Sequence, residues 1–160
     1  MPLTIYIYDT HVLPMLDCSE VPLGDEINLI RAYLGVIQLR MQGRLQVHFE
    51  VPGNLRTVRV PPLSLATLVE NAIKHGLAPL PSGGTISVVA STSRGLLDLV
   101  VADNGVGLKA DSGGGTGIGL YNVRARLATL YGASATLQVQ ANRPTGVCAT
   151  IRLPLREELG

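Results

Sequence analysis

Apolar side chains recur along this chain with two periods, one typical of helices and one typical of strands. Over residues 23–41 they fall at alternating steps of three and four, which predicts an amphipathic helix of about five turns, ended by Gly43. Residues 44–51 alternate between apolar and polar side chains, so we expect a strand with one exposed face. A second helical pattern over residues 62–75 begins at a Pro-Pro pair, and Gly76 is its expected stop.

The rest of the chain predicts strands and one further helix. Strands are expected near 85–92 and 96–102, and after a glycine-rich segment a helix extends to Gly132. Strands near 134–140 and 147–153 complete the pattern. This order predicts an α/β two-layer sandwich, a mixed β-sheet with helices packed on one face.

The first 20 residues stand apart from this pattern. Residues 3–8 predict a short strand, and the segment 1–20 as a whole is either irregular or the remnant of a preceding linker. We therefore assign residues 21–160 to a single domain. A coiled-coil seam is the alternative for the helix over 23–41, but the helix spans too few heptads, so packing on its own sheet is favoured.

Composition narrows the class of protein. The chain has 160 residues, of which 46% are hydrophobic and 16% charged, enough for one domain with a substantial core. Its net charge of +1 gives no reason to expect nucleic acid or an anionic membrane as partner. Apolar runs are too short to span a bilayer, and no signal peptide opens the chain. Cys18 and Cys148 are isolated, which favours reduced cytosolic thiols, and His11, His48 and His75 form no metal-binding spacing.

The glycine-rich segment carries the strongest chemical signal. Asp103 ends an apolar run and is followed by Asn-Gly-Val-Gly, and the run Gly-Gly-Gly-Thr-Gly-Ile-Gly occupies residues 113–119. Glycines let backbone N–H groups approach a polyanion, and a helix start adds partial positive charge. Because an Asp at the end of a strand can accept a hydrogen bond from an exocyclic amine, the segment predicts a purine nucleotide site.

Three alternative assignments of this segment fit the residues less well. An ordinary turn needs one or two glycines, not a recurring cluster. A dinucleotide fingerprint lacks its helix start and its acidic residue at the ribose-binding distance. A P-loop is excluded because no Gly-Lys-Ser/Thr follows the glycines.

A polar stripe marks the helix over 62–75. Thr67, Asn71, Lys74 and His75 share one face at steps of three and four. A carboxamide, an ammonium group and an imidazole suit Mg²⁺–triphosphate, whose metal takes most of its ligands from phosphate and water. The alternative is a solvated face with an ion pair between Glu70 and Lys74, and on this helix alone that alternative is favoured. The glycine segment shifts the balance toward the nucleotide.

Three motifs in this order resemble the GHKL ATP-binding superfamily of gyrase, MutL, heat-shock chaperones and histidine kinases. They begin at Glu70 (Glu-Asn-Ala-Ile-Lys-His-Gly), at Asp103 (Asp-Asn-Gly-Val-Gly) and at Gly115 (Gly-Thr-Gly-Ile-Gly-Leu). More narrowly, the chain resembles the catalytic domain of sensor histidine kinases of the LytS-like group. The segment from Val21, the Val-Pro-Pro before the second helix and the Asn-Val-Arg-Ala-Arg-Leu at Asn122 suggest this group, and the resemblance covers nearly the whole chain.

The resemblance implies a Bergerat-type ATP-binding fold with ATP and Mg²⁺ as ligands. Asn71 would bind Mg²⁺, and Asp103 would accept the adenine amino group. Lys74 and His75 would face the phosphates, and residues 108–116 would close over ATP as a lid. The glycine motifs would supply the remaining contacts, at Gly105 and Gly107 to the base and at Gly115, Thr116, Gly117, Ile118, Gly119 and Leu120 toward the triphosphate.

The chain departs from the family pattern at three places. Thr67 stands where gyrase-type hydrolases carry a Glu that activates water, so phosphoryl transfer is favoured over hydrolysis; Glu70 is a weaker candidate catalytic group. Val147 replaces a Thr common before the last strand, so a hydroxyl near the base is missing. The phosphoacceptor segment Asn-Pro-His-Phe-Leu-Phe-Asn is absent, and His11 lies outside any such context.

The function implied is transfer of the ATP γ-phosphate to a histidine on a separate helical phosphoacceptor domain, with a response regulator downstream. The expected location is cytoplasmic, in a parent protein that can carry an inner-membrane anchor. One alternative is a GHKL regulatory module, such as a serine kinase that binds a sigma factor. Another is an ATP sensor without turnover.

Overall fold

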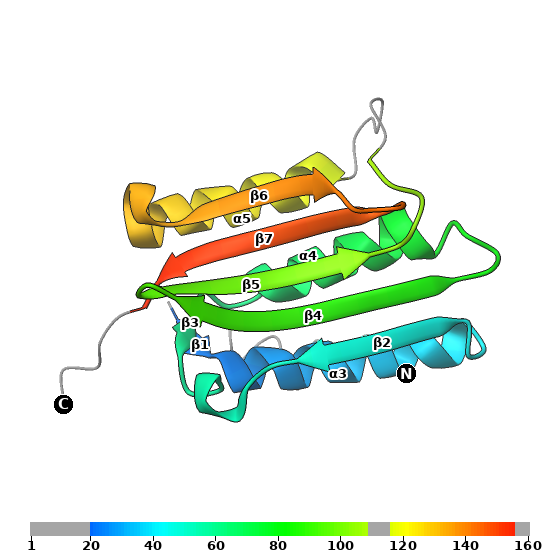
Figure 1. Ribbon diagram of the computed structural model, residues 1–160, viewed down its shortest axis with the longest axis horizontal. Coiled ribbons are helices and arrows are strands. Elements are labelled where there is room, and N and C mark those ends of the chain that lie inside the picture. Colours follow the sequence, from blue (N-terminus) through cyan, green and yellow to red (C-terminus); the bar gives the residue numbers. More distant parts are fainter. Residues whose placement is uncertain (1–19, 109–115, 156–160) are drawn as a thin grey trace.

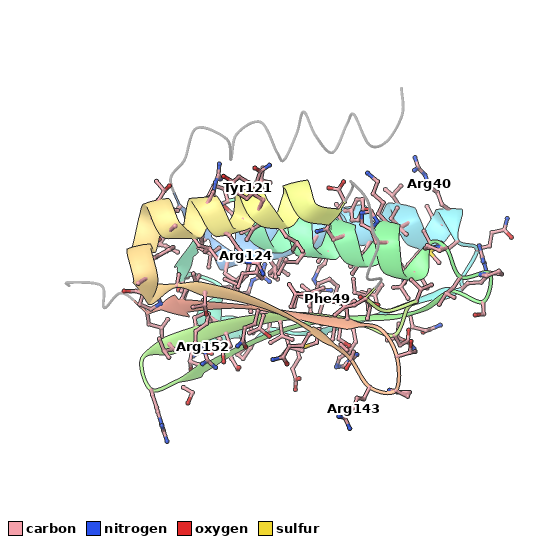
Figure 2. The ribbon with its side chains drawn as sticks, turned by 90° about the horizontal axis from the view of Figure 1, so that it is seen from above. Arg40, Phe49, Tyr121, Arg124, Arg143 and Arg152 are labelled. Atoms are coloured by element: carbon pink, nitrogen blue, oxygen red, sulfur yellow. The ribbon has the colours of Figure 1, made fainter. Side chains whose placement is uncertain are left out.

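The computed structural model describes residues 20–108 and 116–155, and these form a sheet covered on one face by helices. Figure 1 shows the helices α3, α4 and α5 behind the sheet, and Figure 2 shows the two layers from above. The predicted α/β two-layer sandwich is therefore confirmed. The segments 1–19, 109–115 and 156–160 lie outside the described residues, and with them the expected strand over 3–8, His11 and Cys18.

The main sheet has five strands in the order β2-β4-β5-β7-β6. Strand β2 pairs with β4 in parallel, and all the other neighbours are antiparallel, which makes the sheet mixed. The strands span Leu45–Glu50 (β2), Gly84–Ser93 (β4), Leu96–Asp103 (β5), Thr136–Ala141 (β6) and Val147–Pro154 (β7). Each lies within about two residues of its predicted position.

Within the ranges that the structure describes, three α-helices form the second layer. They span Leu23–Arg40 (α3), Ser64–Asn71 (α4) and Thr116–Tyr131 (α5). The predicted apolar positions of α3 face the core, and Leu23, Ile27 and Leu34 are almost fully buried. Packing of α3 within its own domain, rather than in a coiled coil, is thereby confirmed.

Shorter elements connect these layers. A two-stranded antiparallel sheet joins β1 (Val21–Pro22) to β3 (Arg59–Val60), and single 3₁₀ turns cover Gly53–Leu55 (η2) and Gly132–Ser134 (η4). The hydrophobic periods did not predict these elements, because two or three residues are too few to show a period.

The start of α4 differs from the prediction. The helix begins at Ser64 rather than at Pro62, because Leu63 has a left-handed backbone (φ 67°, ψ 0°) that cannot belong to a right-handed helix. The carboxylate of Glu26 accepts hydrogen bonds from the N–H groups of Leu63 (2.9 Å) and Ala66 (3.0 Å). A side chain from α3 thus satisfies N–H groups that the helix itself leaves unpaired.

The end of this helix also differs, and the expected stop at Gly76 is wrong. The chain continues as a π-helical segment, η3 (Ala72–Leu77), in which the Ala78 N–H donates to the carbonyl of Ile73, five residues earlier. Gly76 is buried inside this segment because it packs against another part of the chain, and it does not cap the helix.

Candidate nucleotide-binding site

A cavity of about 220 Å³ opens beside the end of α4, and side chains from both layers line it. Its walls come from α4 and η3, from α5 and from strands β5, β6 and β7. Most of the wall is apolar, at Leu68, Ala72, Pro79, Val101, Leu108, Leu120, Val139, Val147 and Ala149, and the polar lining side chains are Asn71, Lys74, His75 and Asp103. An apolar slot with a few convergent polar groups is the common form of a small-molecule site.

Asp103 points into this cavity because of its place in the strand. Side chains of β5 alternate between the two faces, and Leu97, Leu99 and Val101 all point to the buried side. Asp103 is the next residue in that series, so its carboxylate replaces an apolar side chain on the inner face and is only 3% exposed.

Burial raises the pKa of the Asp103 carboxyl, and backbone N–H groups of Gly105 and Val147 oppose this shift by stabilising the charged form. The Gly105 N–H donates to Oδ1 at 2.8 Å. A carboxylate held by backbone donors in an apolar slot is a directional acceptor for an amine on a ligand.

Two glycines let the chain pack closely around this carboxylate. A Cβ on Gly76 would lie 2.8 Å from Asp103 Oδ1, and a Cβ on Gly105 would lie 2.2 Å from the carbonyl oxygen of Gly76. The Val106 N–H donates to that same carbonyl at 3.0 Å. The end of β5 and the π-helical segment are therefore locked together, with no room for a side chain between them.

The π-helical segment explains how Lys74 and His75 reach the same cavity as Asn71. A π turn changes the rotation per residue, and such turns are frequent at functional sites. Lys74 is exposed and His75 half-buried, and both line the cavity. Together with Asn71 and Asp103 they supply the polar lining side chains of the cavity.

The Asn71 carboxamide meets the requirement for a metal ligand supplied by this helix. Its Nδ2 is buried and has no hydrogen-bond partner among the described residues. A flip of the side-chain amide exchanges the positions of Nδ2 and Oδ1, so the oxygen can take this unpartnered position. The described part of the chain contains no group of three or more His, Cys, Asp or Glu side chains able to hold a metal. A metal ion here would thus take one protein oxygen from Asn71 and its other ligands from phosphate and water, which is the arrangement Mg²⁺ prefers.

The structure brings six of the predicted site residues together. Asn71, Lys74, His75, Asp103, Gly107 and Leu120 all line the cavity. Of the solvated-face alternative, Glu70 and Lys74 are exposed, but no ion pair between them forms among the described residues, and Asn71 Nδ2 is buried.

Other predicted residues do not line the cavity. Glu70 is exposed, and its charge acts on Tyr33 of α3, where it helps burial to raise the pKa of that phenol to about 12. Gly105 supports Asp103 from behind through its backbone N–H. Gly119 lies where a Cβ would be 3.2 Å from Thr67 and 3.5 Å from the Asn71 amide, so it lets α5 approach α4 closely.

The second glycine motif is only partly described. Thr116, Gly117 and Ile118 form the first turn of α5, which gives the expected helix start after the glycines. Gly115, together with most of the predicted lid over 108–116, lies outside the described residues.

Sequence reasoning missed two residues that support Asp103 from outside the cavity. The Asn142 side chain donates to the carbonyl of Asp103 (2.9 Å), and the Thr145 hydroxyl donates to the carbonyl of Gly105 (2.8 Å). No periodic pattern marks them, because they act across a contact between two loops about 40 residues apart in the chain.

Comparison with known proteins relates this site to one family. Residues 63–157 match a family model described as histidine kinase-, DNA gyrase B- and HSP90-like ATPase. The sensor histidine kinase YesM of Bacillus subtilis is 30% identical over 142 residues, which cover 87% of this chain and 25% of that protein. The sensor protein LytS of the same organism is 29% identical over 148 residues, covering 86% of this chain and 25% of LytS. The chain therefore spans about a quarter of the length of these relatives.

A solved structure shares the fold. The histidine kinase ThkA, in complex with the response regulator protein TrrA, superposes with a TM-score of 0.65 over 98% of this chain and 50% of that one, at 19% identity.

Proposed function

The chain belongs to the family of histidine kinase-, DNA gyrase B- and HSP90-like ATPases, and from this premise we propose that it is the catalytic domain of a sensor histidine kinase. ATP binding follows from membership of the family. The proposed reaction is transfer of the γ-phosphate of ATP to a histidine on a separate phosphoacceptor domain. Relatives at 30% and 35% identity are sensor histidine kinases, which supports a kinase over other members of the family.

One observation carries the proposal more than any other. Asn71 and Asp103 are 32 residues apart in the chain, on a helix and on a strand, and both line one cavity with apolar walls. A purine ring fits apolar walls, and its exocyclic amine would donate to the Asp103 carboxylate. Lys74 would stabilise the charge of the phosphates at the exposed side of the cavity.

Mg²⁺ is part of this proposal. Asn71 would hold it, and when bound the ion would neutralise charge on the phosphate oxygens. The residues of the chain would act mainly by positioning the nucleotide and excluding water from the base. Thr67 supports transfer over hydrolysis, because it stands where a carboxylate base would activate water. Its hydroxyl already donates a hydrogen bond to the Leu63 carbonyl (2.7 Å).

The partners proposed are a helical domain that carries the acceptor histidine and a downstream response regulator. ThkA was solved with its response regulator, and its fold is shared here. Within the described residues no helix has the length and apolar character needed to cross a bilayer.

Phosphoryl transfer can be tested with separate domains. The chain is mixed with Mg²⁺, γ-labelled ATP and the histidine-containing helical domain of a LytS-like kinase, and acid-labile label on that domain is measured. We expect label on the added domain, at a rate that rises with its concentration. An acceptor with the histidine replaced by Gln is the matched control.

The same assay, repeated with a sigma-factor regulator in place of the helical domain, separates the alternative functions. Nucleotide binding without any transfer to several such acceptor domains would favour an ATP sensor. Transfer to a serine of a sigma-factor regulator would favour the other alternative, a serine-kinase switch. Either result would reject the histidine kinase.

A further inference from the structure

The turn between β6 and β7 contacts Asp103, the last residue of β5, and the loop that follows it. This turn, which we call the β6–β7 turn, comprises residues 142–146. Asn142 Nδ2 donates to the carbonyl of Asp103 at 2.9 Å, and Thr145 Oγ1 donates to the carbonyl of Gly105 at 2.8 Å. The two accepting carbonyls flank Asn104, so together they fix the peptide planes just after the carboxylate.

The β6–β7 turn is itself well defined by hydrogen bonds. The Asn142 N–H donates to the Gly146 carbonyl at 2.9 Å and closes the turn. Asn142 Oδ1 accepts from the Arg143 N–H at 3.0 Å, so both ends of this one carboxamide are used. A rigid turn can hold the loop after Asp103 in one position, whereas a flexible turn would move together with that loop.

Backbone packing brings the turn and the loop into direct contact. Gly146 has a positive φ of 107°, and a Cβ there would lie 1.8 Å from the carbonyl oxygen of Asp103. The next residue, Val147, lines the cavity, and its backbone N–H stabilises the charged Asp103 carboxylate. The turn therefore continues directly into the wall of the site.

The remaining contacts of this loop come from the other side. Asn104 Oδ1 accepts from the Thr85 N–H at 2.7 Å, and the Val106 N–H donates to the Gly76 carbonyl at 3.0 Å. These contacts tie the loop to β4 and to the π-helical segment. The β6–β7 turn supplies the opposing contacts, so the loop is held between the two.

We propose that Asn142 and Thr145 are positioning residues that orient the Asp103 carboxylate and so set the selectivity of the site for the adenine base. Neither side chain lines the cavity, so both act through the backbone of residues 103–105. The inference rests on the proposed function, because it assigns the carboxylate to the base of a nucleotide.

The direction of the effect follows from hydrogen-bond geometry. A hydrogen bond weakens steeply when its angle departs from linearity, so a carboxylate released from one support loses part of its bond to the adenine amine. Inosine triphosphate has a carbonyl in place of that amine, so it cannot donate to Asp103 from the position at which adenine does. Loss of support should therefore weaken ATP binding and leave inosine triphosphate binding nearly unchanged.

The test compares matched variants of the turn. Thr145→Val removes the hydroxyl at nearly constant shape, and Thr145→Ser restores it. Asn142→Ala removes the other donor. Arg143→Ala serves as the control, because the Arg143 side chain is exposed and points away from the helix layer, as Figure 2 shows.

Dissociation constants for ATP and inosine triphosphate are measured by calorimetry with Mg²⁺, and the melting temperature of each variant is recorded. We expect Thr145→Val and Asn142→Ala each to weaken ATP binding roughly fivefold, with inosine triphosphate binding and melting temperature close to those of the parent. Thr145→Ser and Arg143→Ala should keep the parent's preference for ATP.

Two results would overturn the inference. One is affinities for both nucleotides that stay at the parent's values in both Thr145→Val and Asn142→Ala. The other is a parallel loss of both nucleotides with a lower melting temperature, which a merely structural role would give. If the parent itself bound neither nucleotide, the proposed function would fail, and that outcome is distinct from the other two.

Discussion

At the scale of single residues, the site depends on how closely the backbone approaches the Asp103 carboxylate. Gly76 lies inside a helical segment, where glycine is normally unfavourable compared with alanine by about 1 kcal/mol. A side chain does not fit at this position, because a Cβ would lie only 2.8 Å from Asp103 Oδ1. The cost to the helix is thus offset by a carboxylate held against the backbone.

Two glycine-to-alanine substitutions test this close approach. Gly35→Ala in α3 meets nothing within 4 Å, so it should raise the free energy of unfolding by about 0.5–1 kcal/mol. Gly76→Ala must displace the Asp103 carboxylate, so it should lower the free energy of unfolding by about 1–3 kcal/mol and weaken ATP binding. Urea unfolding measures the first effect and calorimetry the second. A stabilised Gly76→Ala protein with unchanged ATP affinity would contradict the close packing of Gly76 on Asp103.

At the scale of elements, the position of α4 is set by a residue of another helix. Glu26 of α3 is fully buried, and burial raises its pKa to about 7 even though the N–H groups of Leu63, Leu65 and Ala66 and the charge of Arg126 act to lower it. The Arg126 guanidinium of α5 also donates to the Pro62 carbonyl at 3.0 Å. The start of α4 is therefore held from both neighbouring helices, and α4 carries Asn71 at its other end.

This buried carboxyl predicts how stability depends on pH. The pKa of Glu26 is raised from 4.5 to about 7 in the folded state, so the folded protein binds this proton more tightly than the unfolded chain does. Its contribution to stability is complete below about pH 4.5, decreases as the pH rises, and is lost above about pH 7. A shift of this size corresponds to about 3 kcal/mol.

Denaturant unfolding between about pH 4.5 and 8 measures this dependence. Glu26→Gln carries no titrating group, so its free energy of unfolding should vary less over this range than that of the parent. Asp25→Asn removes an exposed carboxylate on the same turn of α3 and should leave the variation as it is in the parent. Equal pH profiles for the parent and Glu26→Gln would show that Glu26 does not titrate in this range.

At the scale of the whole molecule, the helices cover one face of the sheet (Figure 1). The site lies where they meet the end of β5 at Asp103 and the start of β7 at Val147. Helices α4 and α5 and three strands each supply part of the cavity wall. A ligand in the cavity therefore contacts both layers at once. Its binding should stabilise the domain as a unit rather than a single element.

Thermal unfolding tests this coupling. Mg²⁺ and ATP at about 100 times the dissociation constant should raise the free energy of unfolding by about 2.7 kcal/mol, which shifts the melting temperature by several degrees. Asn71→Ala should lose the part of this shift that depends on Mg²⁺, since its oxygen is the proposed protein ligand. Gln138→Ala, on the opposite face of β6 from the cavity-lining Val139, is the matched control and should keep the full shift. An equal Mg²⁺-dependent shift in Asn71→Ala would reject the role of that residue.

Much of this architecture could be predicted from local pattern. Periods of two and of 3.6 residues place the five strands of the main sheet and the three α-helices, because each of these elements buries one face and must repeat it. The carboxylate at the end of β5 and the amide on α4 stood out as polar groups near apolar runs. Two helix boundaries could not be predicted, because the start of α4 depends on Glu26 of another helix and its end on packing against Asp103.

The sequence by itself therefore determined the order of the elements, the family resemblance and the residue types available to bind a nucleotide. Only the tertiary structure decided that Asn71 and Asp103 line one cavity, that Glu70 does not, and that Asn142 and Thr145 support the loop from behind. The physical reason is the separation along the chain between the residues that interact. Hydrophobic periodicity acts between residues a few positions apart, whereas the site is built from contacts between segments that only packing of the two layers brings together.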